Sequence, residues 1–142
     1  MSRQKIINNV FAHHPVIGEL CREAEDSYGA SNYNAALACL FVMSEASLKY
    51  VLNYDHTERL GFFQIIESAK AQGFLSTEES DTFHQLRKVR NDLFHDDPYS
   101  LALTFNNLVY PYSESDTRKL VYELFADKVF GVTARAVSQN AL

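Results

Sequence analysis

The fold is decided by the stretch STEESDTFHQLRKVRNDLFH, residues 76–95, which predicts one long amphipathic helix. Ser76 and Glu79 have the spacing of a capping box, in which the serine hydroxyl and the glutamate carboxylate bind backbone N–H groups at the start of a helix. Asp96-Asp97-Pro98 ends the helix, because proline disfavours helical geometry in the residue before it. The apolar residues that recur at helical steps are Phe83, Leu86, Val89 and Leu93. Such a helix needs neighbours that cover its apolar side.

Helical periodicity continues on both sides of this stretch. A preceding helix is predicted from about Thr57 to Gln72, followed by Gly73 in the left-handed conformation that often ends helices. Its inward-facing residues are expected to be Leu60, Phe63, Ile66 and Ala69. A final helix begins at about Asp116. The apolar residues of this last helix are Leu120, Val121, Leu124, Phe125, Val129 and Val132.

Two more helices are predicted nearer the N-terminus, after a short amphipathic segment at residues 6–11. The first begins at Pro15, whose fixed φ suits the first position of a helix, and ends at Gly29. The second runs from about Asn32 to Leu52 and is apolar on most sides, so we expect it in the middle of a bundle. The predicted fold class is therefore all-α, an up-and-down bundle of four to six helices.

One segment remains open between two interpretations. Residues 101–110 alternate partly, with Leu101, Leu103 and Phe105 apolar, which is typical of a strand. The same stretch also fits a helix through Leu101, Phe105 and Leu108.

Length and composition predict a single domain over residues 1–142. The chain has 142 residues, of which 46% are hydrophobic and 22% charged, without a Pro- or Gly-rich linker or an internal repeat. Cys21 and Cys39 are too few for a disulfide framework and are expected to be small buried apolar residues in a reducing compartment. Without a run of 18 apolar residues or a secretory signal, the chain is expected to be cytoplasmic, with no membrane partner. The net charge of −5 argues against broad binding to duplex DNA.

Several kinds of site have no support in the sequence. Signatures of dinucleotide binding, nucleoside triphosphatases, serine hydrolases and zincins are absent, so no cofactor is expected. His13-His14 is interpreted as a capping or surface pair, and no metal is expected at His95-Asp96-Asp97. His56 and His84 are expected to face solvent.

One constellation remains, Arg90-Asn91 followed by His95 near the end of the long helix. This segment resembles the HEPN superfamily (higher eukaryotes and prokaryotes nucleotide-binding), whose signature is an arginine, usually followed by a polar residue, and a histidine after four to six intervening residues. The upstream sequence Ser44-Glu45-Ala46-Ser47-Leu48 is similar to the glutamate-containing second helix of many of these domains. The resemblance covers about residues 32–110. It implies a metal-independent endoribonuclease of the toxin or phage-defence type, with Arg90, Asn91 and His95 as catalytic residues.

Two features bear on which members of this group the chain resembles. Many HEPN toxins that pair with nucleotidyltransferase antitoxins have a tyrosine two residues after the histidine, but here that position is Asp97 and the nearest tyrosine is Tyr99. The segment 90–95 followed by Leu103-Thr104-Phe105 also resembles the mannitol operon repressor family, which is regulatory. The alternative function is therefore a non-catalytic module whose partner is a nucleotidyltransferase or another regulatory protein.

Helix geometry predicts a homodimer if these residues are catalytic. Residues five apart on an ideal helix differ by about 140° in azimuth, so Arg90 and His95 do not share a face. His84, Lys88, Asn91 and His95 form one polar stripe, whereas Arg90 lies nearer the apolar side. Two copies of this helix packed about a two-fold axis would bring Arg90 of each chain to the partner's His95.

In such a dimer, His95 would move protons, Arg90 would stabilise the phosphorane charge, and Asn91 would orient His95 or a phosphate oxygen. The competing interpretation is structural: Arg90 pairs with Glu45 or another carboxylate, and His95 caps the helix C-terminus. The strip from His84 to Asp97 is neutral apart from its histidines, which predicts weak affinity for generic RNA.

Overall fold

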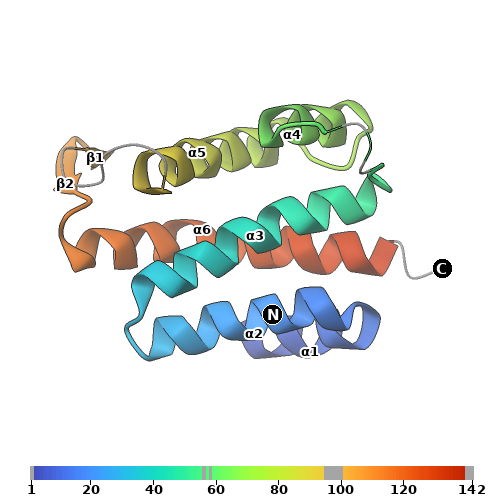
Figure 1. The fold of residues 1–142 in the computed structure, drawn as a ribbon, viewed down its shortest axis with the longest axis horizontal. Helices are drawn as coiled ribbons and strands as arrows, with labels where there is room; N and C mark the ends of the chain where they lie inside the picture. The colour runs from blue at the N-terminus through green and yellow to red at the C-terminus, as the bar shows by residue number, and fades with distance from the viewer. Residues whose placement is uncertain (1, 56, 58, 95–100, 140–142) are drawn as a thin grey trace.

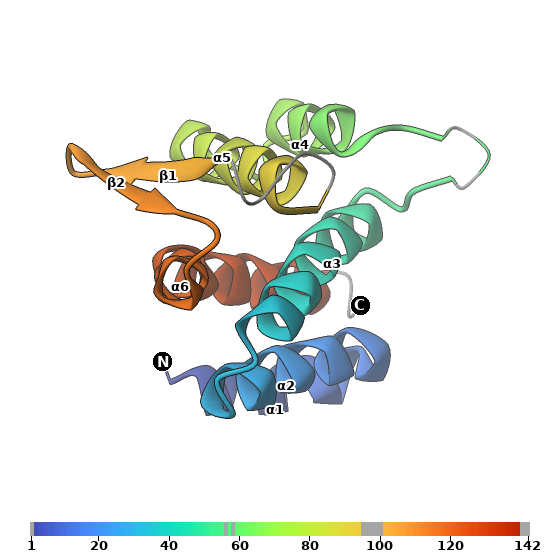
Figure 2. The same cartoon turned by 60° about the vertical axis from the view of Figure 1, so that its left-hand side comes forward.

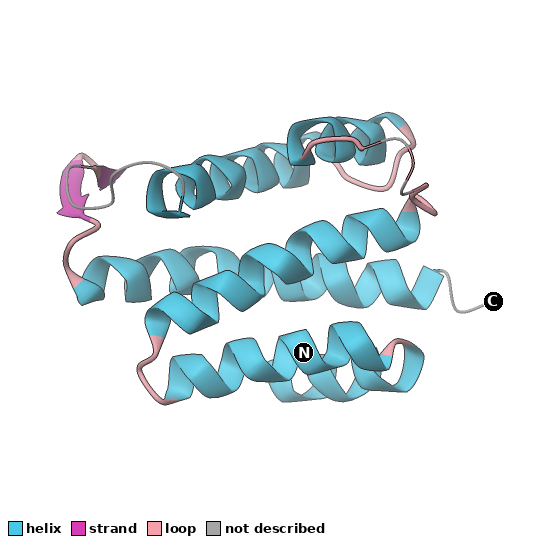
Figure 3. Ribbon diagram, viewed as in Figure 1, coloured by secondary structure: helices cyan, strands magenta, loops and turns pink. Residues whose placement is uncertain are grey.

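The computed structural model describes residues 2–55, 57, 59–94 and 101–139, which form the predicted all-α bundle (Figures 1 and 3). A β-hairpin stands between the last two helices. The elements are α1 (Arg3–His13), α2 (Pro15–Gly29), α3 (Tyr33–Val51), α4 (Phe62–Ala71), α5 (Thr77–Phe94), β1 (Ala102–Phe105), β2 (Leu108–Pro111) and α6 (Ser115–Gln139). Among the described helices, none combines the length and apolar character needed to cross a membrane.

The helices are arranged in three layers (Figures 1 and 2). Helices α1 and α2 form one outer layer, α3 and α6 the middle, and α4 and α5 the other outer layer. The middle position of α3 confirms the prediction from its apolar surface, because it packs against α2, α4, α5 and α6. The buried side chains of α3 are Ala36, Leu37, Leu40, Phe41, Met43, Ser44, Ser47 and Leu48.

Local signals placed several helix ends correctly. The Ser76 amide donates to the Glu79 carboxylate at 2.9 Å and the Glu79 amide donates to the Ser76 hydroxyl at 3.1 Å, so the predicted capping box is confirmed. Gly73 has φ +81°, as expected for a left-handed residue after a helix. Pro15 begins α2, and His14 caps it by accepting from the Ile17 amide at 3.2 Å. The capping role expected for the histidine pair therefore holds for His14.

The predicted start of α4 is wrong by five residues. Residue Arg59 has φ +52°, which is incompatible with a continuous helix, and the helix begins only at Phe62. The Gly61 amide donates to the Gln64 side chain at 2.9 Å and so satisfies one group at the new start. Phe63 is 49% exposed instead of buried, because the apolar face of the shorter helix falls elsewhere. That face consists of Phe62, Ile65, Ile66 and Ala69.

Residues 102–111, left open by the sequence, form an antiparallel hairpin. Its register pairs Ala102 with Pro111 and Phe105 with Leu108. The turn consists of Asn106 and Asn107, with φ of 52° and 63°, and asparagine tolerates this left-handed region better than most residues. The adjacent asparagines Asn106 and Asn107 are the feature of the sequence that favours a hairpin over a helix in this segment.

The cysteines behave as predicted only in part. Cys21 is fully buried, and this burial raises the pKa of its thiol to about 12. Cys39 is only half-buried, because it lies toward the edge of the packed face of α3. Both are free thiols.

Candidate functional site

Arg90 projects from α5 toward α3 and α4 and lies beside a carboxylate. Its Nη1 atom is 3.6 Å from Glu45 Oε2, and its guanidinium carbon lies 4.9 Å from the centre of the Phe62 ring. The side chain is 24% exposed. The sequence-based alternative that pairs Arg90 with Glu45 is therefore confirmed as a contact. An arginine held between a carboxylate and an aromatic face has a fixed orientation.

Glu45 does not use up the charge or the donors of Arg90. The same carboxylate also lies 3.6 Å from Lys49 Nζ, so one anion faces two cations. The Arg90 Nε atom is buried and has no hydrogen-bond partner among the described residues. Since a guanidinium carries five N–H donors, the contacts of Arg90 with the described residues leave capacity for an additional anion.

A groove of about 420 Å³ opens beside Arg90. Val42 and Phe94 on its walls are 53% and 47% exposed, and Phe94 meets Phe41 edge-on at 5.6 Å between ring centres. The lining residues are Ala38, Phe41, Val42, Glu45, Gly61, Phe62, Arg90 and Phe94. They come from α3, α5 and the start of α4, so no local sequence pattern could have revealed the groove.

Two of the three predicted catalytic residues, Arg90 and Asn91, are among the described residues. Arg90 lines the groove, and Asn91 is half-buried on the next position of α5. His95 lies outside the described residues, and so do Asp96, Asp97 and Tyr99. The predicted capping role of His95, and the expectation of no metal at His95-Asp96-Asp97, therefore concern residues outside the described ones as well.

A second group of contacts joins His84 on α5 to Phe63 on α4. It is not apparent from the sequence because its residues come from two helices. His84 was expected to face solvent, but both of its ring nitrogens are buried and lack a hydrogen-bond partner within the described chain. Its Nε2 atom lies 3.7 Å from Glu67 Oε2, which is too long for a hydrogen bond. The exposed Phe63 ring lies 4.9 Å from the His84 ring and 5.3 Å from the Arg87 guanidinium. The prediction for His84 holds only in part, because its side chain is 22% exposed while both ring nitrogens are buried.

Among the described charges of the strip that begins at His84, the cations Arg87 and Lys88 lie apart from the carboxylate Asp92. Arg87 is partly exposed beside Phe63, and Lys88 is exposed on the adjacent position. Asp92 instead faces Tyr112: burial and, to a lesser degree, this carboxylate raise the pKa of the Tyr112 hydroxyl to about 12. The side of α5 that carries Arg87, which faces α4, is therefore cationic.

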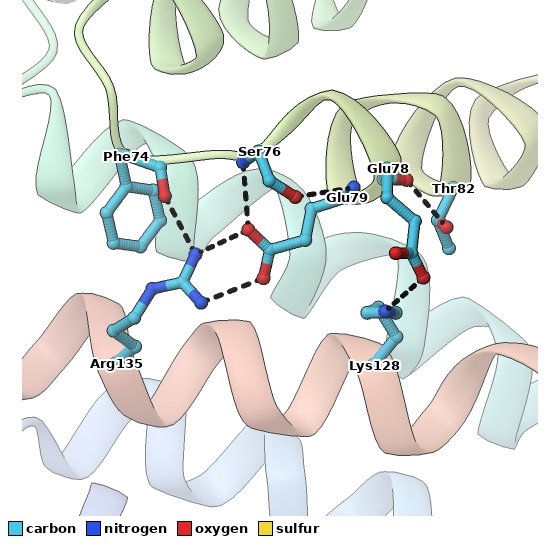
Figure 4. A network of polar contacts seen from close by, with 7 residues as sticks. All are labelled: Phe74, Ser76, Glu78, Glu79, Thr82, Lys128 and Arg135. Atoms are coloured by element: carbon cyan, nitrogen blue, oxygen red, sulfur yellow. Dashed lines mark hydrogen bonds and ion pairs between the residues drawn. The ribbon is translucent and has the colours of Figure 1, made fainter.

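The first turn of α5 is fixed to α6 at the opposite end from Arg90 (Figure 4). Arg135 donates to Glu79 through two nitrogens, at 2.8 and 2.9 Å, and to the Phe74 carbonyl at 2.8 Å. Lys128 binds Glu78 at 3.2 Å. The Arg135 hydrogen bonds lower the pKa of Glu79 to about 2, against the opposing effect of burial. These contacts anchor the helix that carries the candidate site.

A larger depression of about 660 Å³ lies at the C-terminal end of α3 but contains none of the predicted site residues. Its lining residues are His14, Val16, Ile17, Leu20, Ala46, Lys49, Tyr50, Asn53 and Tyr54. Over the part of the chain that the structure describes, no three His, Cys, Asp or Glu side chains gather as a metal site. Comparison of the chain with protein-family models, curated proteins and solved structures gives no match.

Proposed function

We propose that the protein is a metal-independent endoribonuclease that acts as a homodimer, with Arg90, Asn91 and His95 in its composite cleft. The observation that carries the proposal is the state of Arg90: it is oriented by Glu45 and Phe62, it lines an open groove, and its Nε atom has no hydrogen-bond partner among the described residues. A cation arranged in this way suits the charge that develops on a phosphate during cleavage.

The chemistry is an internal displacement at phosphorus. The ribose 2′-oxygen attacks the adjacent phosphorus while His95 removes its proton, and Arg90 stabilises the added negative charge. The bond between phosphorus and the 5′-oxygen then breaks, and the partner's His95 supplies the proton to that oxygen. The products are a 2′,3′-cyclic phosphate and a 5′-hydroxyl end. DNA lacks the 2′-hydroxyl and is not cleaved.

Exposed apolar side chains beside Arg90 support the dimer. Val42 and Phe94 border the groove, and Phe94 immediately precedes His95 in the sequence. Burial of these side chains against a second copy would stabilise the association and exclude water near Arg90. A stable interface would bury more than about 1,000 Å² in total.

The test is incubation of the purified protein with total RNA in EDTA, followed by analysis of the fragment ends. We expect 2′,3′-cyclic phosphate ends, and their loss in Arg90→Ala and His95→Ala. Arg22→Ala is the matched control, because Arg22 is an exposed arginine on α2 that pairs with Glu19. Cleavage that survives both site substitutions would show that the activity belongs to a contaminant.

A second candidate function is a non-catalytic module that binds a regulatory protein, such as a nucleotidyltransferase antitoxin. The observation that favours it is the apolar wall of the groove, since Val42, Phe41 and Phe94 suit a protein side chain better than a phosphate. Expression in cells separates the two functions. Growth arrest that is cured by His95→Ala supports the ribonuclease, whereas harmless expression together with retention of a specific partner supports the module.

A further inference from the structure

Two adjacent phenylalanines at the start of α4 each receive one arginine from α5. Phe62 is buried and lies under Arg90, while Phe63 is exposed and lies beside Arg87, with guanidinium-to-ring distances of 4.9 and 5.3 Å. Arg87 and Arg90 are about one helical turn apart. An exposed aromatic ring therefore stands one turn from the arginine that we place in the cleft.

Some buried polar atoms around Phe63 have no hydrogen-bond partner among the described residues. Both ring nitrogens of His84 and the Nε atom of Arg87 are buried without a hydrogen bond to any described residue. Buried polar atoms are paired in most native proteins, so unpaired ones mark places where a water or a ligand group completes the site. Here three such atoms lie within the surroundings of one exposed ring.

The surface around this ring is cationic although the chain as a whole is acidic. Lys70 is exposed on the same face of α4 as Phe63 and Glu67, and Lys88 is exposed next to Arg87. We call this surface the Phe63 patch; it consists of Phe63, Glu67, Lys70, His84, Arg87 and Lys88. The patch contains three permanent cations and one carboxylate, and the exposed Asp81 lies about one turn before His84 on α5, whereas the whole chain has a net charge of −5.

We infer that the Phe63 patch binds an unpaired nucleotide of the RNA substrate, with the base stacked on Phe63 and the phosphate near Lys88. Aromatic rings beside arginines are the usual stacking platforms for single-stranded RNA, and a base inside a duplex has no free face to offer. The inference rests on the proposed ribonuclease function and specifies its substrate as RNA that is single-stranded next to the cleaved bond. The partly exposed guanidinium of Arg87 would donate to the edge of the base or to its sugar.

Binding is measured by fluorescence anisotropy with a labelled 12-nucleotide single strand that carries 2′-O-methyl groups and therefore cannot be cleaved. Phe63→Ala should raise Kd about tenfold, as for loss of one base stack. Phe63→Trp should keep the affinity. Lys88→Gln should weaken binding and reduce the slope of log K against log salt by about 0.7, as for loss of one phosphate contact. Val16→Ala on α2, where Val16 is 69% exposed, is the matched control.

The outcomes separate this inference from the proposed function. Unchanged affinity in Phe63→Ala, while the wild type cleaves unmodified RNA, overturns the stacking site and leaves the ribonuclease. Binding that depends on Phe63 without any cleavage supports the stacking site and overturns the ribonuclease. Loss of self-association in Phe63→Ala at unchanged RNA affinity shows that the patch is a protein contact and overturns the inference. A control duplex of the same sequence should bind more weakly than the single strand.

Discussion

Arg135 on α6 and Glu79 on α5 form a bidentate ion pair, with nitrogen-to-oxygen distances of 2.8 and 2.9 Å. Glu79 simultaneously accepts from the Ser76 amide, so one carboxylate both caps α5 and fixes it to the middle layer. Arg135 also lies over the Phe74 ring at 4.7 Å. The position of α5, and thus of Arg90 at its other end, depends on this contact.

The Glu79 contact predicts an acid-sensitive stability. Its pKa is lowered from 4.5 to about 2, so its contribution is fully present above pH 4.5 and is lost as the pH falls toward 2. We expect Glu79→Gln to lower the free energy of unfolding at pH 7 by about 1 to 2 kcal/mol, a modest value because Arg135 is partly exposed. Urea unfolding at several pH values measures this. The wild type should lose its advantage over Glu79→Gln between pH 4.5 and 2.

The variant Ser76→Ala serves as the control for this prediction. It removes the hydroxyl that caps α5 but leaves Arg135 and Glu79 in contact, and should cost about 1 kcal/mol. Its difference from the wild type should change less with pH than that of Glu79→Gln. If the free energy of unfolding of Glu79→Gln differs from that of the wild type by the same amount at every pH, the ion pair does not contribute to stability.

The crossing of α1 and α2 depends on Gly18. A Cβ atom at this position would lie 2.8 Å from Phe11 Cγ and 2.9 Å from Phe11 Cα, so the backbone would have to move. We expect Gly18→Ala to destabilise the protein by about 1 to 3 kcal/mol. Gly131→Ala on α6 is the matched control, because a Cβ there meets nothing within 4 Å and should stabilise the helix by about 0.5 to 1 kcal/mol. Thermal unfolding should shift in opposite directions for the two variants.

Phe94→Glu tests the proposed dimer. Phe94 is 47% exposed at the groove, so a charge there should not disturb the monomer but should oppose burial against a second copy. Light scattering should show the wild type at twice 16.2 kDa and the variant at 16.2 kDa, with unchanged helical circular dichroism. A wild type that is already monomeric at micromolar concentration would remove the composite cleft.

Glu45→Gln tests whether Glu45 positions Arg90 for cleavage. The substitution keeps the size of the side chain but removes the charge that faces Arg90 and Lys49. We expect kcat for RNA cleavage to fall about tenfold or more, because small displacements of a catalytic group are costly, while KM changes little. Stability should fall by less than about 1 kcal/mol, since the ion pair is long and partly exposed.

Two further variants interpret the Glu45 result. Glu45→Asp keeps the charge and should recover part of kcat. Glu19→Gln removes a carboxylate from the exposed pair with Arg22 and should leave kcat unchanged. Equal losses of kcat in all three would contradict a positioning role for Glu45.

The helical class, and the helix ends that depend on residues close together along the chain, follow from the amino-acid sequence alone. The capping box of Ser76 and Glu79, the start of α2 at Pro15 and the left-handed Gly73 were all predicted correctly. These features involve groups within about one turn of each other, so a short window of sequence contains all the interacting partners. The contact of Arg90 with Glu45 was also named as an alternative, because an arginine near an apolar face needs a carboxylate.

Which side chains stay exposed depends instead on how the helices pack together. Phe63 was expected on the inner side of its helix and is 49% exposed, whereas His84 was expected to face solvent and is 22% exposed, with both ring nitrogens buried. The groove at Arg90 unites α3 with α5, and the charges of α5 separate because Asp92 faces Tyr112. Each of these facts depends on how helices distant in sequence pack together. Burial is a property of the assembled core, and a periodic pattern along one helix does not specify which neighbour covers it.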